Sequence, residues 1–203
     1  ANAGHAYAMQ TASRNTSKIA RLEYVRGGLP ALNHLTEFLQ HAEQDSSAWQ
    51  QLGERLATLH SYIKTLPKQA LIIAEADILP TLQQAISESW QQAIVPATTT
   101  LTDDPICADS SDIAWLAQTN VYHHALVFAA VPTDHADAPA LMVLSSVLRN
   151  NYLHRTIREQ GGAYGGGASY DSNACSFKFY SYRDPRDQAT FDDFLASVDW
   201  LLA

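Results

Sequence analysis

The sequence has 203 residues, 46% hydrophobic and 17% charged, which is typical of a globular protein and excludes a largely disordered one. Its formal net charge is −8, so we expect no nucleic-acid partner, because acidic surfaces repel phosphates. The absence of a run of 18 apolar residues argues against a membrane partner. We expect a soluble protein; its compartment stays unknown, with a slight preference for the cytoplasm.

The first half of the sequence is dominated by patterns typical of helices. Alternation of small residues predicts a strand over residues 5–13, and a short apolar run predicts a buried one over 70–74. Apolar residues at helical spacing, with capping residues before them, predict helices. A polar stretch without periodicity is expected to be a loop. The predicted helices cover residues 17–25, 30–41, 46–66 and 78–93. The predicted loop covers residues 97–111.

The second half combines strands with two longer helices. Strands are expected over 113–118 and 121–131, and a hairpin is expected from 163–171 and 175–182 around Ser172 and Asn173. Helices are expected from Asp137 to the glycines at 161–162, and over 188–202. This order predicts an α+β layer sandwich, a mainly antiparallel sheet with helices on one face, as a single domain over residues 1–203.

The residues needed for several kinds of site are missing. None of the eight histidines is followed by another four residues later, so neither H-x-x-E-H nor its inverse is present and we expect no metal site. His123 and His124 are adjacent on a predicted strand and should point to opposite faces. Cys107 and Cys175 are expected to be free structural thiols, because two cysteines are no disulfide framework.

Five of the nine glycines lie within residues 161–167, on both sides of Tyr164. A phosphate-binding loop would precede a helix, whereas this cluster follows one and leads into a strand. Gly161 and Gly162 suit a helix end. The glycines after Tyr164 favour close approach by another backbone or a ligand, so we expect the loop to hold Tyr164 in an open, accessible place. Arg158, in the last turn of the helix, has a simple interpretation as a cation at a helix C-terminus and a second one as a partner of Tyr164.

The run IREQGGAYGGG, followed by SYRDP at 181–185, resembles the pitrilysin or insulinase superfamily of zinc metallopeptidases, in the branch of the presequence proteases and their bacterial relatives. The earlier run GGLPALNHLTEFLQ resembles a helical segment of the last domain of that branch. The likeness is strong after Leu148 and weak before it. The first residues, which include no methionine, are expected to be internal to a longer polypeptide.

The resemblance implies four similar α+β domains in two halves that close around a chamber, of which this chain would be the fourth. Zinc and the catalytic glutamate would lie in the first domain, so this chain would hold no cofactor and would be inactive alone. Arg158 and Tyr164 match the two residues that reach the substrate at the zinc. We assign them catalytic and substrate-binding roles, and substrate binding to Gly162 and Gly165 beside them.

The expected partners are a peptide substrate and the zinc-bearing half of the same polypeptide. Tyr164 would donate a hydrogen bond to the oxyanion, and Arg158 would hold a substrate carbonyl. The alternative is a non-catalytic structural domain of the same superfamily, against which the presence of both residues argues. A small-molecule binding module that uses the glycine loop is a third interpretation. The SYRDP segment is expected to be structural.

Overall fold

The computed structural model describes residues 4–66, 70–90 and 112–203. These residues divide into two compact units. One contains the sheet and the helices that cover it. The other begins at Glu37 and contains the end of one helix of the first half and the two helices that follow it. The assignment of residues 1–203 to a single domain stays a prediction.

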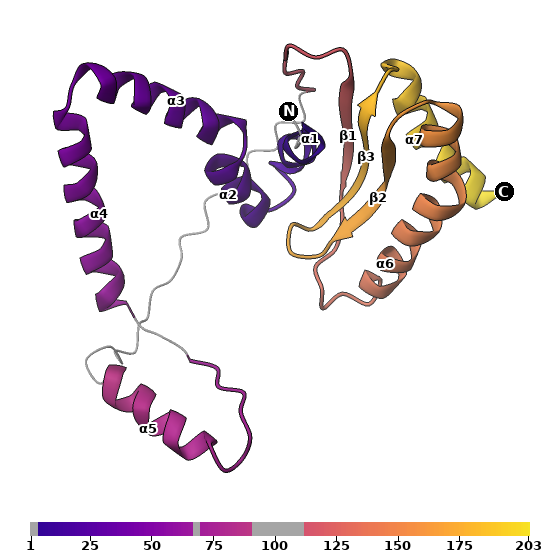
Figure 1. Ribbon diagram of the computed structural model, residues 1–203. Helices are drawn as coiled ribbons and strands as arrows, with labels where there is room; N and C mark the ends of the chain where they lie inside the picture. Colours follow the sequence, from indigo (N-terminus) through magenta and orange to yellow (C-terminus); the bar gives the residue numbers. More distant parts are fainter. Residues whose placement is uncertain (1–3, 67–69, 91–111) are drawn as a thin grey trace. The chain divides into compact units, whose positions relative to one another are not determined.

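The sheet has three antiparallel strands, β1 (Tyr122–Ala129), β2 (Gly165–Asp171) and β3 (Ser176–Asp184), in the order β1-β3-β2 (Figure 1). The hairpin of β2 and β3 pairs Asp171 with Ser176 at its tip and Gly165 with Tyr182 at its open end. The predicted α+β class with an antiparallel sheet is therefore confirmed. Aromatic and β-branched residues in β1 and β3 favour strands, and the turn residues after Asp171 set their register.

Three helical segments cover one face of this sheet: α6 (Ala138–Val147), η1 (Leu148–Gln160) and α7 (Gln188–Leu202). Together they supply half of a continuous core, and Ala163 before β2 and inward-facing residues of β2 and β3 supply the rest. η1 continues α6 but is a π-helix, whose hydrogen bonds span one residue more than those of an α-helix. The buried core consists of Leu148, Leu153, Ile157, Ala163, Ala168, Phe177, Phe179 and Phe194.

The strand predicted over residues 5–13 is wrong, because these residues form the helix α1 (Gly4–Ser13). The alternation of Ala6 and Ala8 is compatible with a helix as well, since alanine has the highest helix propensity. α1 packs on β1 and β3. Its His5 ring contacts Tyr182, which alternates along β3 with core residues, so α1 lies on the face opposite α6, η1 and α7.

The four helices predicted from apolar periodicity in the first half are present. The side chain of Ser17 caps α2 by accepting from the Ala20 N–H at 3.1 Å, as expected of an N-cap serine. Pro30 lies in the first turn of the next helix. The helices are α2 (Lys18–Gly27), α3 (Leu29–Gln44), α4 (Ser47–Thr65) and α5 (Leu79–Trp90).

Two other predicted strands are wrong. Residues 70–74 and 113–118 are irregular, and their apolar side chains, such as Leu71, Ile73 and Leu116, are exposed. A short apolar run does not by itself supply the neighbouring strand with which its backbone must pair. The predicted loop over 97–111, including Cys107, lies outside the described residues. Cys175 is a free thiol, and the absence of a disulfide stays a prediction.

Candidate functional site

The glycine cluster forms the turn from η1 into β2, and both candidate catalytic residues belong to this segment. Residues 158–165 are called the Tyr164 turn. The Gly162 N–H donates to the Arg158 carbonyl at 3.2 Å, and the Ala163 N–H donates to the Ile157 carbonyl at 3.1 Å. The first is the bond of the simpler, αL type of glycine helix end, and the second spans one residue more than the corresponding bond of a Schellman end. Gly162 has a φ of +78°, which glycine adopts without steric cost.

Tyr164 projects from this turn and is 60% exposed. Its N–H donates to the Arg183 carbonyl at 3.3 Å, which ties the turn to the end of β3. The ring centroid lies 5.5 Å from that of Tyr182, and the guanidinium of Arg183 lies 5.6 Å from the Tyr164 ring centroid. This is within the range of a cation–π contact. The structure therefore holds the backbone and ring of Tyr164 while leaving the residue open to solvent.

Packing explains the glycines after Tyr164. A Cβ on Gly165 would collide with the ring of Tyr182, 2.7 Å from its hydroxyl oxygen. A Cβ on Gly166 or Gly167 would lie 2.7 Å from a side-chain carbon of Ile157 or Arg149, respectively. Close approach was the correct expectation for these glycines: side chains approach all three, and at Gly166 a Cβ would also lie 2.9 Å from the backbone carbonyl oxygen of Tyr180. The substrate-binding assignment of Gly162 and Gly165 stays a prediction.

Arg158 is exposed in the last turn of η1. Its backbone carbonyl accepts the Gly162 N–H, and this hydrogen bond lies within the segment of five residues that connects Arg158 to Tyr164. Its place at a helix C-terminus fits the simple interpretation as well, because the carbonyl end of a helix attracts a cation. The structure thus places Arg158 and Tyr164 at the two ends of one turn.

Aromatic rings extend from Tyr164 into the sheet. The His5 ring centroid lies 4.9 Å from that of Tyr182 and 6.5 Å from that of His123. Burial lowers the pKa of His123, and the charges of His5, His124 and Arg183 lower it further. His123 is therefore neutral at neutral pH. The rings of Tyr182, His5 and His123 therefore pack next to one another on the sheet side of Tyr164. His123 contributes no positive charge to the site.

The SYRDP segment forms a buried polar network on the other side of the sheet. Asp184 is fully buried and accepts from the Thr190 hydroxyl at 2.8 Å and from the Arg186 N–H at 3.0 Å. His124 Nδ1 lies 2.9 Å from the hydroxyl oxygen of the fully buried Ser181. These contacts support the structural role expected for this segment. His123 and His124 face opposite sides of the sheet, as predicted.

This network is not a nucleophilic triad. Nδ1 of His124 lies 2.9 Å from the hydroxyl oxygen of Ser181, but the Asp187 carboxylate that faces Nε2 is 3.9 Å away, beyond hydrogen-bond distance, so no carboxylate orients the ring as a triad requires. Burial lowers the pKa of His124, although the carboxylates of Asp184 and Asp187 act in the opposite direction. Ser181 has no access to solvent. The network stabilises the fold rather than a substrate.

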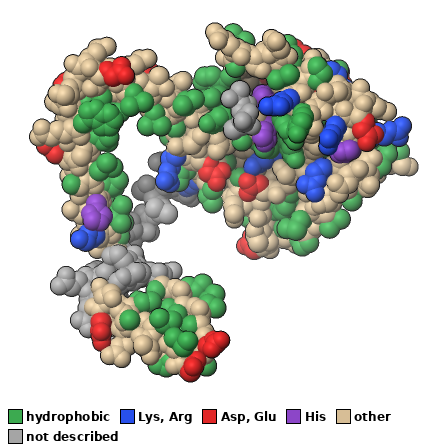
Figure 2. Space-filling model, viewed as in Figure 1, with side chains coloured by type: hydrophobic (Ala, Val, Ile, Leu, Met, Phe, Trp, Pro, Cys, Tyr) green, Lys and Arg blue, Asp and Glu red, His purple; other side chains and the backbone are tan. Residues whose placement is uncertain are grey.

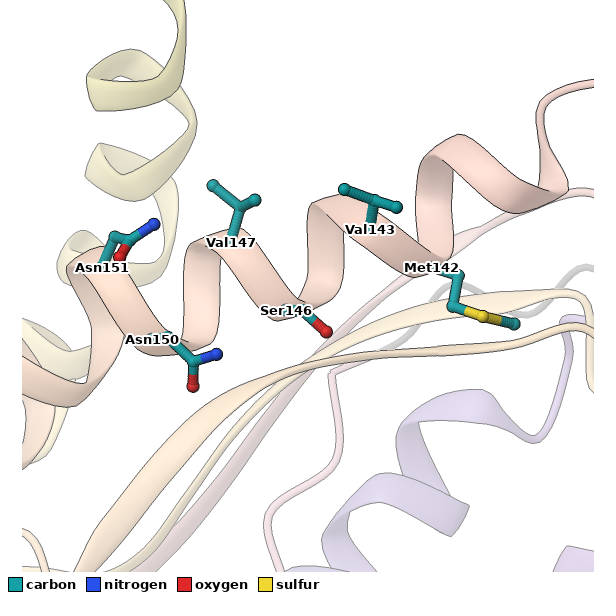
Figure 3. Close-up of a pocket in the computed structure, with 6 residues that line it drawn as sticks. All are labelled: Met142, Val143, Ser146, Val147, Asn150 and Asn151. Atoms are coloured by element: carbon teal, nitrogen blue, oxygen red, sulfur yellow. The ribbon is translucent and has the colours of Figure 1, made fainter.

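No cluster of three or more metal-ligating side chains occurs within residues 4–66, 70–90 and 112–203. The expectation that this chain holds no metal stays a prediction. A hollow of about 310 Å³ lies along α6 and the start of η1 (Figure 3). It contains neither candidate residue and no charged side chain. Its lining consists of Met142, Val143, Ser146, Val147, Asn150 and Asn151.

Comparison with known proteins assigns the family. Residues 127–203 match the family model described as the PreP C-terminal domain. The chain is 29% identical to a mitochondrial presequence protease of Yarrowia lipolytica, over 98% of this chain and 20% of that protein. It is 30% identical to the one of Drosophila melanogaster, over 100% of this chain and 19% of that protein. The chain belongs to the presequence protease family, as a C-terminal domain.

The presequence protease of Danio rerio is 45% identical over 73 residues, which are 36% of this chain. The chain spans about a fifth of the length of the relatives that match most of it. These relatives are named as mitochondrial, so they give no support to the slight preference for the cytoplasm. Within the described residues, no helix is long and apolar enough to cross a membrane.

Two residues near the site were not singled out in the sequence. The guanidinium of Arg183 lies over the Tyr164 ring, and that of Arg186 lies against Gly161, where a Cβ would collide with it. Both belong to the strand end around SYRDP. The SYRDP motif is visible in the sequence, but its position beside the Tyr164 turn is not, because it depends on the pairing of β2 with β3.

Proposed function

We propose that this chain is the substrate-positioning and transition-state-stabilising domain of a zinc metalloendopeptidase that degrades peptides inside a closed chamber. The family assignment supports a peptidase. The observation that carries the specific role is Tyr164, an exposed phenol on a turn whose successive backbone N–H groups are all hydrogen-bonded. A packing residue would be expected to bury its ring, whereas this one is supported from beneath and open on its other side.

The proposed chemistry uses two side chains of the turn. The Tyr164 hydroxyl donates a hydrogen bond to the oxygen of the scissile carbonyl as that oxygen becomes negative. The Arg158 guanidinium donates to a backbone carbonyl of the bound peptide and fixes its register. The described residues do not fit a metal ion, so the metal that the family resemblance implies is assigned to the rest of the polypeptide. Water activation is therefore assigned outside this chain.

Replacing Tyr164 by phenylalanine in the full-length peptidase tests this role. The ring and the turn are retained, and only the donor is lost. We expect kcat to fall about a hundredfold to a thousandfold, with KM little changed, because the hydrogen bond strengthens in the transition state. Steady-state kinetics on a short quenched-fluorescence peptide measures both constants. Tyr62→Phe, at an equally exposed tyrosine of α4, is the matched control.

Arg158→Ala should behave differently. A residue that holds bound substrate contributes before the transition state as well, so KM should rise while kcat falls. Arg155→Ala, at another exposed arginine of η1, should leave both constants near wild type. The 203-residue chain alone should cleave no peptide; chelator-sensitive cleavage by the purified chain would contradict the proposal.

The alternative, a non-catalytic structural domain, has its support in the packing roles of Gly165, Gly166 and Gly167. It predicts wild-type turnover for Tyr164→Phe when the chemical step limits the rate. The proposed partners are a peptide substrate and the zinc-bearing half of the same polypeptide, with no nucleic acid and no membrane. The mitochondrial names of the relatives suggest an organelle, and imaging of the tagged full-length protein tests this.

A further inference from the structure

The side chain of Arg186 is held in one place by two carboxylates. Its Nη1 atom donates to Asp193 of α7 at 2.7 Å, and its Nε atom lies 3.5 Å from an oxygen of Asp184. The backbone N–H of Arg186 donates to the same oxygen of Asp184 at 3.0 Å. Charge-assisted hydrogen bonds are short and directional. The guanidinium, three-quarters buried, is therefore fixed between the end of β3 and the first turns of α7.

The fixed guanidinium lies against the end of η1. A Cβ on Gly161 would collide with the Nη2 and Cζ atoms of Arg186. Gly161 has a φ of −80°, which any residue adopts, so close approach explains the glycine: the Arg186 guanidinium lies on one side, and a Cβ would also lie 2.6 Å from the Ile157 carbonyl oxygen. The Nη2 and Nε atoms are buried without a hydrogen-bond partner in the described part of the chain, so the contact of Nε with Asp184 at 3.5 Å is an ion pair and the hydrogen-bonded anchor is Asp193. The two carboxylates hold the guanidinium against Gly161, and the negative carbonyl end of η1 attracts its positive charge.

Gly161 begins the segment that presents Tyr164. The N–H groups of the next three residues all donate to backbone carbonyls, to those of Arg158, Ile157 and Arg183 in turn. A displacement of Gly161 must therefore shift or break the hydrogen bonds that carry Tyr164. Arg186 also follows three residues after Arg183, whose carbonyl holds the Tyr164 N–H. Arg186 thus acts on both sides of Tyr164: it contacts Gly161 before it, and it lies close in sequence to Arg183, which binds the Tyr164 N–H.

We propose that Arg186 is a positioning residue for the Arg158–Tyr164 pair. Its guanidinium, anchored by Asp184 and Asp193, fixes Gly161 and so sets where the phenol of Tyr164 is presented. Arg186 itself contacts no substrate and acts through the turn. This inference rests on the proposed function in so far as it concerns catalysis, but its structural content, the ordering of the turn, has a readout of its own.

Arg186→Met in the full-length peptidase removes the guanidinium and keeps much of the stem. The first measurement is amide hydrogen exchange, by mass spectrometry, of the peptic fragment that spans residues 158–167. We expect exchange there to become about tenfold faster or more, because opening of a local hydrogen-bonded unit governs it. Arg155→Met, the same substitution on exposed η1 surface, should leave the fragment at the wild-type rate. An unchanged exchange rate in Arg186→Met would overturn the proposal.

The second measurement is kcat in a double-mutant cycle. If Arg186 acts through Tyr164, then Arg186→Met should lower kcat about tenfold in the wild type and little in the Tyr164→Phe background, because residues in one unit are not additive. Full additivity of the two losses would reject action through Tyr164. Wild-type turnover of Tyr164→Phe with faster exchange in Arg186→Met would instead reject the proposed function and retain the ordering role.

Asp193→Asn keeps the experiment decisive if Arg186→Met does not fold. It weakens one anchor of the guanidinium at a partly exposed site and leaves the buried Asp184 intact. The expected change is the same in kind and smaller in size, a severalfold faster exchange of the 158–167 fragment. Arg186→Lys should recover part of the order, since an ammonium can still pair with one carboxylate but lacks the planar fork. Equal exchange in the lysine and methionine variants would argue against a guanidinium-specific contact.

Discussion

The sheet with its covering helices and the helix α4 bury their apolar side chains to very different degrees. η1, α7 and the strands share a core in which Leu153 and Phe194 are fully buried. Ala48 is the buried residue of α4, while Trp49, Leu56 and Leu59 of its apolar stripe are exposed. Figure 2 shows hydrophobic side chains on the surface of the helical segments. Matched substitutions in the 203-residue chain can test whether stability follows this burial.

The largest difference is expected between two leucines in helices. Leu153→Ala should lower the free energy of unfolding by about 2–5 kcal/mol, because it removes buried methyl groups and leaves a cavity in a packed core. Leu56→Ala, at a side chain that is 55% exposed, should change it by no more than about 0.5 kcal/mol. Urea unfolding followed by circular dichroism measures both. Similar losses at the two leucines would show that α4 is covered in solution.

A smaller difference is expected between two threonines that each make one hydrogen bond. The Thr190 hydroxyl donates to the buried carboxylate of Asp184 at 2.8 Å, and the Thr58 hydroxyl donates to the Glu54 carbonyl at 2.9 Å on the surface of α4. Thr190→Val should destabilise by about 1–3 kcal/mol, because a buried charged acceptor loses a donor. Thr58→Val should lie within about 0.5 kcal/mol of wild type. A null result at Thr190 would mean that water replaces its hydroxyl.

The same contrast explains which elements could be predicted from the sequence. α4 was predictable because an amphipathic stripe and a cap specify a helix locally, whether or not the stripe is covered. β1 and the hairpin were predictable because aromatic and branched residues end at turn residues. α1 was not predictable, because an alternation of small residues over nine positions is compatible with the period of a strand and with that of a helix. The apolar runs at 70–74 and 113–118 were wrongly predicted as strands, because an apolar run does not reveal whether a partner strand is available.

The candidate site was predictable only in part. Glycines on both sides of Tyr164 indicated an exposed tyrosine, and the structure bears this out. The π-helix before the turn was not predictable, because its extra residue per hydrogen bond depends on how η1 packs against the sheet. Arg186 could not be assigned either. It follows Gly161 by 25 positions in the sequence, and the pairing of β2 with β3 brings the two residues into contact.

The smallest expected effect is a dependence of stability on pH that comes from the sheet region. Burial holds the pKa of His124 below 6.5, and the Arg186 charge adds to this, while Asp184 and Asp187 oppose it. The unfolded chain therefore binds a proton at a higher pH than the folded chain does. The free energy of unfolding should fall as the pH drops through about 6.5, until the folded form is protonated as well.

Urea midpoints between about pH 7.5 and about pH 5.5 measure this slope, since that interval spans the ordinary histidine pKa. His124→Gln should flatten the slope without abolishing it, because burial also lowers the pKa of His123. His60→Gln, the same substitution at an exposed histidine of α4, is the matched control for the loss of an imidazole. A His124→Gln slope equal to that of the wild type would mean that His124 is solvated in the folded chain, and the buried network around Asp184 would then need to be redrawn.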